Sequence, residues 1–399
     1  MALAALHCLA FVDRTMIGGV LPLLRDGIAM SEAQAGWIVG TAFALPYAAA
    51  ALTLAALGRS RSASPGWLAG GVLLWTLGSV ASGLAGSLIE LSAARALLGI
   101  GQGLFVPLAI ARLIDGTPAD AQGQALGLFT GSATFGRSGA LLVVGWLLIV
   151  LMPVAGIGGL AAWRWLFVVT ALPNLAALLL LVTTLRRQTP ALAGARIAIR
   201  PDWNRLLPLF VVAVAPVLLA QAVLGWLPTL FGRLHGLSAR EAALLVGGVT
   251  LVAAPAGPII AGWWLGRASA WHGRTPVLVR GLLLATLMPL AGVVWLPSLV
   301  GAATSLAVML LTLGGASLAG LFGIQQHSAP GTRVGVNGIY LAFATLVGVG
   351  LGPLLAGMLS GAGGGGGDAL GRALLVTGIV AVGLSVLAGV VVQRTAASA

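Results

Sequence analysis

The ionisable side chains that could carry chemistry in this sequence stand inside long apolar stretches. Asp13 is followed directly by Arg14 near the middle of the apolar run 3–24. Arg95 and Arg137 lie deep in two later apolar runs. Charged groups in hydrocarbon are costly, so they are rare within membrane spans and generally serve a function. The functional interpretation is a proton site at Asp13 beside anion contacts from the arginines, and the alternative is structural ion pairing with other helices.

Further polar positions could take part in such a site. Gln102 follows Arg95 by seven residues, which places both on one helix face about 10 Å apart along the axis. A glutamine can bind a substrate by hydrogen bonds, but it cannot carry a proton. A buried Arg137 needs a carboxylate, carbonyl oxygens or a substrate, and we expect Asp13 or the substrate to hold it. Other polar residues that could line a substrate cavity, or bond neighbouring helices instead, are Tyr47, Gln221, Trp226, Gln325, Asn337 and Tyr340.

Other kinds of chemistry find no support in the sequence. The single Cys8 allows no internal disulfide and no cysteine metal cluster, and the four histidines show no metal-ligand spacing. The glycine-rich string 99–103 lies inside an apolar run rather than after a strand, so it does not indicate a nucleotide site. No nucleophile–base pattern indicates an enzyme. We therefore expect no enzymatic activity, no metal and no cofactor.

The composition is that of an integral membrane protein. Hydrophobic residues make up 59% of the chain, charged residues 8%, and the mean hydropathy is +1.06. A spanning helix needs about 20 mostly apolar residues, and we expect all-α structure with twelve such helices. Their expected edges are 3–24, 34–57, 66–87, 91–113, 122–150, 162–184, 206–231, 238–265, 276–296, 299–324, 333–359 and 369–392, with a loop at Gly361–Gly367.

The arginines between these runs predict the topology. All 21 basic residues are arginine, and with both termini in the cytoplasm 13 fall in cytoplasmic segments and five in outer segments. This excess satisfies the positive-inside rule. Because the charge of +12 is scattered, it does not indicate nucleic-acid binding. We expect an amino-terminal bundle at 1–185, a cytoplasmic linker at 186–205 and a carboxy-terminal bundle at 206–399. The lysine-free composition favours a bacterial inner membrane.

The two halves of the chain repeat weakly. Leu57-Gly58-Arg59 recurs as Leu265-Gly266-Arg267, in each case after the second helix of a half. A parallel repeat of two six-helix halves is typical of one class of secondary transporter, which binds its substrate between the halves.

With these features the sequence resembles the major facilitator superfamily, and within it the anion:cation symporters and the spinster-like carriers. The resemblance covers nearly the whole chain. It implies two six-helix bundles that alternate access to a central site, symport with protons, and Asp13 as the coupling acid. It rests on Phe11-Val12-Asp13-Arg14-Thr15, on Met30-Ser31-Glu32-Ala33-Gln34-Ala35-Gly36 with Phe43 and Tyr47, on Trp75, on Arg95-Ala96-Leu97-Leu98-Gly99-Ile100-Gly101, on Gly225-Trp226-Leu227-Pro228 and on Gly350-Leu351-Gly352-Pro353.

The sequence departs from this family at charged positions. The loop Leu57-Gly58-Arg59-Ser60-Arg61 lacks the acid of the family pattern, and Gln122 stands where a partner arginine is expected. Both changes put the family's cytoplasmic charge latch in doubt. Gln102 replaces an acid of helix four, so Asp13 is the one carboxylate placed deep in a span.

We therefore predict a monomeric secondary transporter that moves a small organic anion together with protons. Three embedded arginines outnumber the embedded acid, which favours an anionic substrate. A drug or lipid exporter of the same superfamily and an uncoupled facilitator are the alternatives within transport. A non-transporting membrane sensor is the alternative from a different class.

Overall fold

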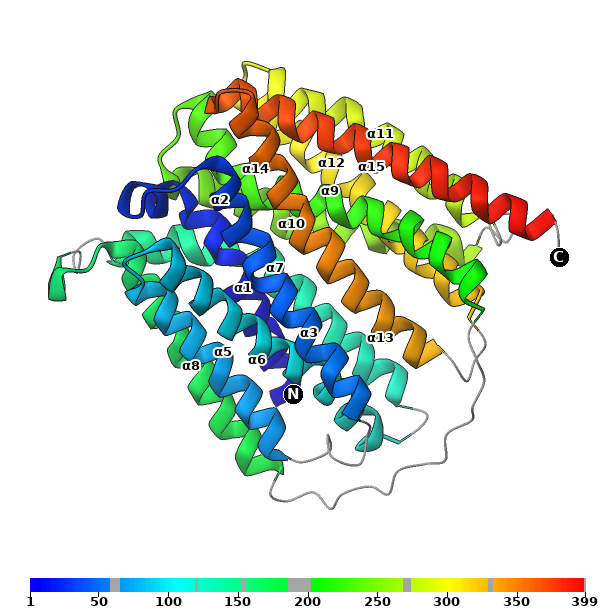
Figure 1. The fold of residues 1–399 in the computed structure, drawn as a ribbon, viewed down its shortest axis with the longest axis horizontal. Coiled ribbons are helices and arrows are strands. Elements are labelled where there is room, and N and C mark those ends of the chain that lie inside the picture. The colour runs from blue at the N-terminus through cyan, green and yellow to red at the C-terminus, as the bar shows by residue number, and fades with distance from the viewer. Residues whose placement is uncertain are drawn as a thin grey trace. The chain divides into compact units, whose positions relative to one another are not determined.

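The computed structural model describes residues 1–57, 65–118, 121–151, 156–185, 202–267, 274–328 and 333–397. Within these ranges the chain forms helices and short connections, without a strand (Figure 1). Twelve helical segments of this described part are long and apolar enough to cross a membrane. The prediction of an all-α fold with twelve spans is confirmed.

Each predicted span corresponds to one helix or to one interrupted helix. The second span consists of α2 (Glu32–Gly36), the π-helical turn η1 (Trp37–Thr41) and α3 (Ala42–Leu57), and the eleventh of α13 (Arg333–Ala344), the π-helical η5 (Thr345–Leu351) and α14 (Gly352–Ala362). A 3-10 turn, η3 (Ile157–Gly159), precedes the sixth span. The other spans are α1 (Ala2–Gly27), α5 (Pro65–Leu84), α6 (Leu88–Asp115), α7 (Gln122–Leu151), α8 (Ala162–Leu185), α9 (Trp203–His235), α10 (Ala239–Arg267), α11 (Thr275–Trp295), α12 (Leu299–Gln326) and α15 (Gly366–Ala397).

The connection between the last two spans is shorter than the expected loop Gly361–Gly367. α14 continues to Ala362 and α15 begins at Gly366, so three residues separate the helices. Gly364, Gly365 and Gly366 have φ angles of 89°, 73° and 85°. Only glycine enters this backbone region without steric cost, so the glycine run encodes a defined tight turn.

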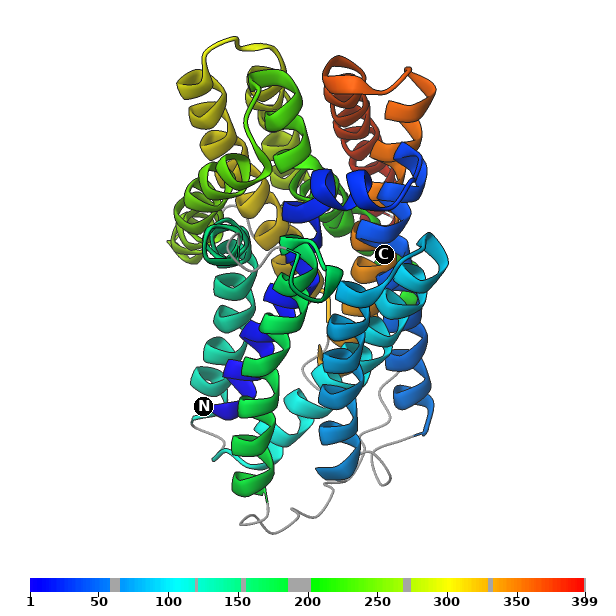
Figure 2. The same ribbon diagram turned by 90° about the vertical axis from the view of Figure 1, so that its left-hand side faces the viewer.

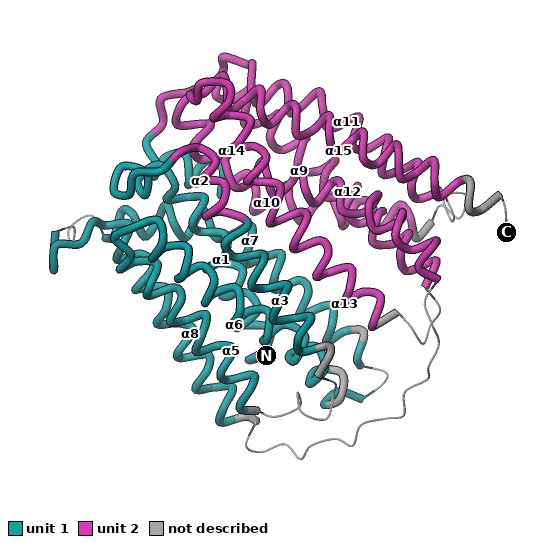
Figure 3. Tube along the Cα trace, viewed as in Figure 1, with its two compact units in different colours: residues 1–30, 41–195, 238–247 teal, residues 31–40, 196–237, 248–399 magenta. Residues whose placement is uncertain are grey.

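The helices fall into two compact units (Figure 3). Unit 1 comprises Met1–Met30, Thr41–Ala195 and Ser238–Gly247, and unit 2 comprises Ser31–Gly40, Arg196–Leu237 and Gly248–Ala399. Residues 31–40 and 238–247, the beginnings of the second and eighth spans, group with a different unit from the rest of their spans. Residues 186–201 of the expected linker and the loop 58–64 lie outside the described residues.

In unit 1, α1 packs against α7 and α8, while α6 packs against α3 and α5 (Figure 2). Two glycines permit close approaches between these helices. A Cβ atom on Gly136 of α7 would overlap the carbonyl oxygen of Cys8, and one on Gly99 of α6 would overlap that of Phe43. Small residues allow membrane helices to approach in this way. They bring α1 against α7 and α3 against α6, the four helices that carry the predicted site residues of unit 1.

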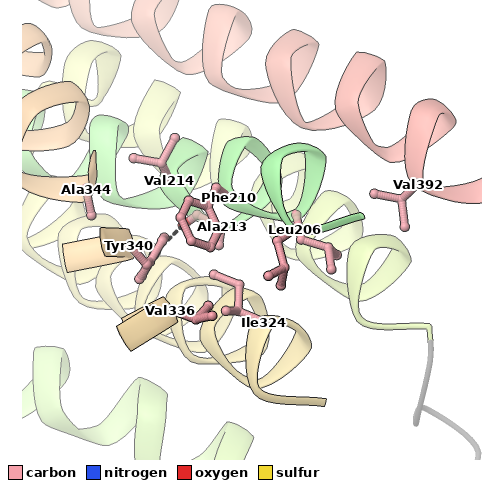
Figure 4. Close-up of a cluster of buried hydrophobic side chains, with 10 residues drawn as sticks. Leu206, Phe210, Ala213, Val214, Ile324, Val336, Tyr340, Ala344 and Val392 are labelled. Atoms are coloured by element: carbon pink, nitrogen blue, oxygen red, sulfur yellow. Dashed lines mark hydrogen bonds between the residues drawn. The ribbon is translucent and has the colours of Figure 1, made fainter. Parts of the chain in front are cut away.

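Unit 2 is built on α9, which packs against α12 and α15. Figure 4 shows a buried cluster in which the Tyr340 hydroxyl donates a hydrogen bond of 3.0 Å to the carbonyl of Ala213, and its ring meets Phe210 edge-on at 5.3 Å. The ion pair between Arg233 and Glu32, 2.6 Å long, fastens α2 to α9 within the same unit. Tyr340 thereby belongs to the core that holds unit 2 together.

Candidate functional site

The candidate site in unit 1 is organised by α1, whose polar residues fall on two faces. His7, Phe11 and Arg14 are spaced i, i+4 and i+7, so they share one face of the helix. Asp13 lies about 100° around the helix from Arg14, on the face of Ala10, and both Asp13 and Ala10 are buried. The adjacent charges of Asp13 and Arg14 therefore meet different neighbours.

Asp13 is bound by an amide from another helix. The side chain is 1% exposed, and its Oδ2 accepts a hydrogen bond of 2.6 Å from Nδ2 of Asn174 on α8, which is also fully buried. Arg95 lies near enough to act electrostatically on the carboxylate. Within the part of the chain that the structure describes, Asp13 forms no ion pair with an arginine.

Arg95 and Gln102 of α6 share a helix face, as predicted, and both bind the backbone of α1. Nη2 of Arg95 donates to the carbonyl of Arg14 at 3.4 Å, and Nε2 of Gln102 donates to the carbonyl of Ala10 at 2.8 Å. Both side chains are buried. Nε and Nη1 of Arg95 have no hydrogen-bond partner among the described residues. These two residues hold α1 in place, and Arg95 retains unused donors.

Three guanidinium groups of unit 1, those of Arg14, Arg95 and Arg137, alternate with two aromatic rings. Cζ of Arg137 lies 4.8 Å from the ring centroid of Phe11, and Cζ of Arg14 lies 5.4 Å from the same centroid. Phe43 in turn has Cζ of Arg14 at 4.7 Å and Cζ of Arg95 at 5.5 Å. We call this set Arg137–Phe11–Arg14–Phe43–Arg95 the arginine–phenylalanine series. It draws its members from α1, α3, α6 and α7.

The series concentrates positive charge. Because Arg14 and Arg137 share one ring, their Cζ atoms lie within about 10 Å of each other. At that distance two positive charges repel by about 2 kcal/mol if the effective dielectric constant is about 20. A buried cation–π contact returns about 2 kcal/mol, which does not also offset the cost of desolvating a guanidinium. An anion placed between Arg14 and Arg137 would remove the repulsion and replace lost hydration.

The structure does not bring Asp13 to Arg137. Asp13 binds Asn174, and Arg137 lies over Phe11. The expectation that Asp13 holds Arg137 is therefore not met, because the two side chains leave their helices toward different partners. The other expected partner, the substrate, stays a proposal.

Aromatic and imidazole groups surround the series. The ring of Tyr47 lies 5.6 Å from that of Phe43. His7 stacks on Phe129 with centroids 3.8 Å apart and planes 7° apart, and its Nδ1 lies 2.9 Å from the Phe129 carbonyl oxygen. Its other neighbour is Phe11, which it meets edge-on at 5.2 Å. The wall of the site beside Arg14 is thus largely aromatic.

Sequence reasoning missed Asn174 and the roles of Phe11 and Phe43. A signal for Asn174 was present, since it is the one carboxamide in the apolar run 162–184. The partner of that amide could not be read from the sequence, because Asn174 and Asp13 are 161 residues apart.

Two of the predicted residues of unit 2, Trp226 and Asn337, make hydrogen bonds within that unit. Nε1 of Trp226 donates to the carbonyl of Pro353 at 3.0 Å, and Oδ1 of Asn337 accepts from Nε2 of Gln325 at 2.8 Å. Gln221 is partly buried on α9, with no hydrogen-bond partner in the described ranges. Trp226 and Asn337 therefore bond helices to one another, whereas the amide of Gln221 stays available.

Comparison with known proteins finds one kind of protein along nearly the whole chain. Residues 3–353 match the family model described as Major Facilitator Superfamily. A crystal structure of a bacterial homologue of the human lysosomal transporter Spinster, inward-facing and occupied, has a TM-score of 0.82 at 22% identity, covering 98% of this chain and 96% of that one. A crystal structure of a D-xylose-proton symporter has a TM-score of 0.70 at 17% identity, covering 96% and 95%. At these identities the two structures show a shared fold.

Relatives found by sequence carry different activities in their names. The probable sulfoacetate transporter SauU of Cupriavidus necator is 31% identical over 174 residues, which cover 41% of this chain and 35% of that protein. The multidrug resistance protein Stp of Mycobacterium tuberculosis is 34% identical over 146 residues, covering 34% and 26%. An MFS-type efflux pump of Mycolicibacterium smegmatis is 26% identical over 394 residues, covering 94% and 87%. The match thus spans about a third or less of the length of the first two relatives.

Proposed function

This chain belongs to the major facilitator superfamily and is a multi-pass membrane transporter, and we propose that it carries a small organic anion. The observation that carries this proposal is the arginine–phenylalanine series. Arg14 and Arg137 face Phe11 without a carboxylate partner among the described residues. An anionic substrate would supply the missing negative charge, and a guanidinium binds carboxylates and related oxyanions through two parallel hydrogen bonds.

The predicted substrate-binding residues of unit 1 take different parts in this proposal. Arg14 and Arg137 would contact the anion directly. Arg95 would add its free donors, while Gln102 keeps α1 in position through the carbonyl of Ala10. Tyr47 would line the aromatic wall beside Phe43.

From unit 2 we propose Gln221, Trp226 and Asn337 as further substrate contacts. Gln221 is the first choice, because its amide has no partner in the described ranges. Trp226 and Asn337 would contribute a ring face and an amide NH₂ group while keeping the hydrogen bonds that they already make.

We further propose proton coupling through Asp13. Coupling requires a group that changes charge during the cycle, and Asp13 is the one carboxylate deep in a span. Support comes from its complete burial and from the neighbouring charge of Arg95. An uncoupled facilitator is the competing proposal, since Gln102 cannot titrate.

For the working cycle we propose alternating access. The functional bundles 1–185 and 206–399 would rock about a central site, as repeat-built transporters do. Both termini would face the cytoplasm, because arginines are concentrated in the segments assigned to that side. We also propose that the protein acts as a monomer in a bacterial inner membrane.

The anion proposal is tested by ligand-induced stabilisation of the purified transporter. A ligand that binds the folded state raises the melting temperature by mass action. The panel contains mono- and dicarboxylates, sulfonates, neutral sugars and cationic drugs. We expect organic anions to stabilise the wild type, and Arg14→Gln to lose that stabilisation. Arg372→Gln removes an exposed arginine of α15 and serves as the charge-matched control.

The possible results separate the proposals. Stabilisation by anions in the wild type and in Arg372→Gln, but not in Arg14→Gln, supports an anion site in unit 1. Stabilisation by sugars or cations alone would contradict it.

Coupling is tested with an anion identified by that panel. The transporter is reconstituted into proteoliposomes, and uptake of the anion is measured with and without an imposed pH gradient. We expect the gradient to drive accumulation by the wild type and not by Asp13→Asn, while Asp13→Asn retains substrate exchange. Equal gradient-driven uptake by both proteins would remove Asp13 from the mechanism, and a wild type indifferent to the gradient would establish a facilitator.

Drug export is the second candidate function. It is favoured by the efflux pump of Mycolicibacterium smegmatis, whose match extends over 94% of this chain. Expression in a drug-sensitive bacterium distinguishes the two candidates, because an exporter raises the inhibitory concentration of several drugs and an anion importer leaves it unchanged.

A further inference from the structure

We propose that Asn174 is the positioning residue of the coupling acid, whose amide holds ionised Asp13 through Nδ2 and protonated Asp13 through Oδ1. The inference rests on the proposed role of Asp13 in proton coupling.

The two ends of the Asn174 amide have unequal surroundings. Nδ2 donates to Oδ2 of Asp13 at 2.6 Å. Oδ1 is buried and has no hydrogen-bond partner among the described residues. The whole side chain is 0% exposed. A buried oxygen without a donor is destabilising, and such groups are few in folded proteins. We infer that Oδ1 of Asn174 accepts a hydrogen bond in another protonation state of the site.

Protonation of Asp13 creates that donor. A carboxylate only accepts hydrogen bonds, whereas a carboxylic acid donates one through its O–H. A primary amide carries a donor and an acceptor on one planar group, so a half-turn about the last side-chain bond exchanges them. When Asp13 takes a proton from water on one side of the membrane, Oδ1 can accept the new O–H. When the proton leaves to water on the other side, Nδ2 returns to the carboxylate. Asn174 itself neither gains nor loses a proton.

The other groups around Asp13 differ from this amide in the hydrogen bonds that they can make. Arginines are permanent donors without an acceptor. Thr170 of α8 lies nearby but already donates to the carbonyl of Leu166. The hydroxyl of Ser79 on α5 also lies nearby, is buried and has no hydrogen-bond partner among the described residues, so it is a second group that can donate to the carboxylate or accept from the acid. The acids of α6, Glu90 and Asp115, stand near the two ends of that helix, and the described part of α5 has no charged residue. The remaining charged or titratable side chains on the helices packed here are His7, Cys8, Arg14, Arg25 and Asp26 of α1, Arg95 and Arg112 of α6, Arg137 of α7 and Arg164 of α8. Arg164 binds the carbonyls of Gly83 and Ala85.

Infrared difference spectroscopy tests the inference without knowledge of the substrate. Spectra of the purified transporter in lipid membranes are recorded across a pH series. The carbonyl band of the Asp13 carboxylic acid is identified by its loss in Asp13→Asn. Its frequency reports what the acid O–H binds, and the pH at half-intensity reports what binds the carboxylate.

Replacing Asn174 should change both readouts. Asn174→Leu keeps a similar volume and removes the donor and the acceptor. We expect the Asp13 band to rise in frequency, since the acid loses its acceptor. We expect its half-intensity point to move by about one pH unit or more toward alkaline pH, since the carboxylate loses its donor. Asn174→Ala gives the same comparison if the leucine variant does not fold. The control is Thr377→Val, which removes a buried hydroxyl bonded only to Ala373 on α15.

The outcomes separate this inference from the proposal on which it rests. A wild-type frequency and half-intensity point in both Asn174 variants would overturn the role of Asn174 and leave Asp13 as the coupling acid. A shifted half-intensity point at unchanged frequency would also overturn it, because the amide would then serve the ionised form alone. The absence of any Asp13 band in the wild type would overturn proton coupling through Asp13, and the role of Asn174 with it.

Discussion

At the scale of single residues, the electrostatics of unit 1 are dominated by guanidinium groups that share aromatic rings. Arg14 and Arg137 both lie over Phe11, and Arg14 and Arg95 both lie over Phe43. Asp13 accepts a hydrogen bond from the amide of Asn174 and forms no ion pair with an arginine among the described residues. Aromatic rings reduce the cost of burying these cations, but they do not neutralise them. We therefore expect the series to be more stable with an anion bound than without one.

Arg137→Gln should separate binding from folding. A charge-assisted hydrogen bond contributes about 1.5–3 kcal/mol, so we expect the Kd of the anion to rise about 10- to 100-fold. The melting temperature of the unliganded protein should hold or rise, because repulsion from Arg14 is relieved. Thermal-shift titration measures both quantities. An unchanged Kd of the anion would show that Arg137 does not contact the anion and has only a structural role.

Gln102→Glu should add a second proton-binding group. Gln102 donates to the carbonyl of Ala10, and a glutamic acid can make that bond only while protonated. We expect the number of protons moved per substrate to increase from one toward two in proteoliposomes. Gln102→Ala, which loses the bond without gaining a titratable group, is the control and should leave the proton number unchanged. An unchanged proton number in Gln102→Glu would contradict the expectation.

At the scale of helices, the site depends on how closely α1 is held. α6 binds carbonyls of α1 through Arg95 and Gln102, α8 binds Asp13 through Asn174, and α7 approaches α1 backbone to backbone at Gly136. Three helices thus fix the rotation of α1, and this rotation decides that Asp13 faces α8 while Arg14 faces the rings. A small displacement of α1 would therefore disturb both the proposed coupling acid and the proposed anion contact.

Gly136→Ala and Gly139→Ala on α7 should behave differently. A Cβ on Gly136 would overlap the carbonyl oxygen of Cys8, whereas a Cβ on Gly139 meets no atom within 4 Å. Overpacking costs about 1–3 kcal/mol, and alanine favours a helix over glycine by about 1 kcal/mol. We expect Gly136→Ala to lower the melting temperature by a few degrees and Gly139→Ala to leave it equal or higher. An equal decrease of the melting temperature in both variants would show that the close approach of α7 to α1 at Gly136 does not determine the stability.

At the scale of the whole molecule, the chain is a twelve-span transporter of the major facilitator superfamily whose described helices form two compact units. The boundary residues 31–40 and 238–247 occupy equivalent places in the two sequence halves. This equivalence agrees with the weak sequence repeat between the two halves of the chain.

Cysteine labelling should establish the orientation in the membrane. In a Cys8→Ser background, we expect Pro297→Cys, on the exposed turn between α11 and α12, to react with an impermeant thiol reagent in intact cells. Arg196→Cys, in the segment outside the described residues, should react only after the membrane is opened. The expectation follows from the arginine excess in the segments assigned to the cytoplasm. Labelling of position 196 in intact cells would contradict the cytoplasmic location of this segment and favour the opposite topology.

Much of this fold was determined by local sequence alone. The twelve spans follow from apolar length, since a helix that crosses a bilayer must satisfy its backbone within the segment and be apolar along about 20 residues. The rarity of intramembrane charge singled out Asp13, Arg14, Arg95 and Arg137, because its cost acts on each residue separately. The spacing of Arg95 and Gln102 put them on one face, because helical periodicity is local.

Only the tertiary structure decided which of these side chains meet. That Asp13 binds Asn174 and not Arg137, that Arg95 and Gln102 bind carbonyls of α1, and that Phe11 and Phe43 separate the arginines depend on the rotation and depth of each helix. Helix rotation is set by packing between segments distant in sequence, such as Gly136 against Cys8. The sequence pattern marks which residues are costly to bury, and packing selects the partner that offsets the cost.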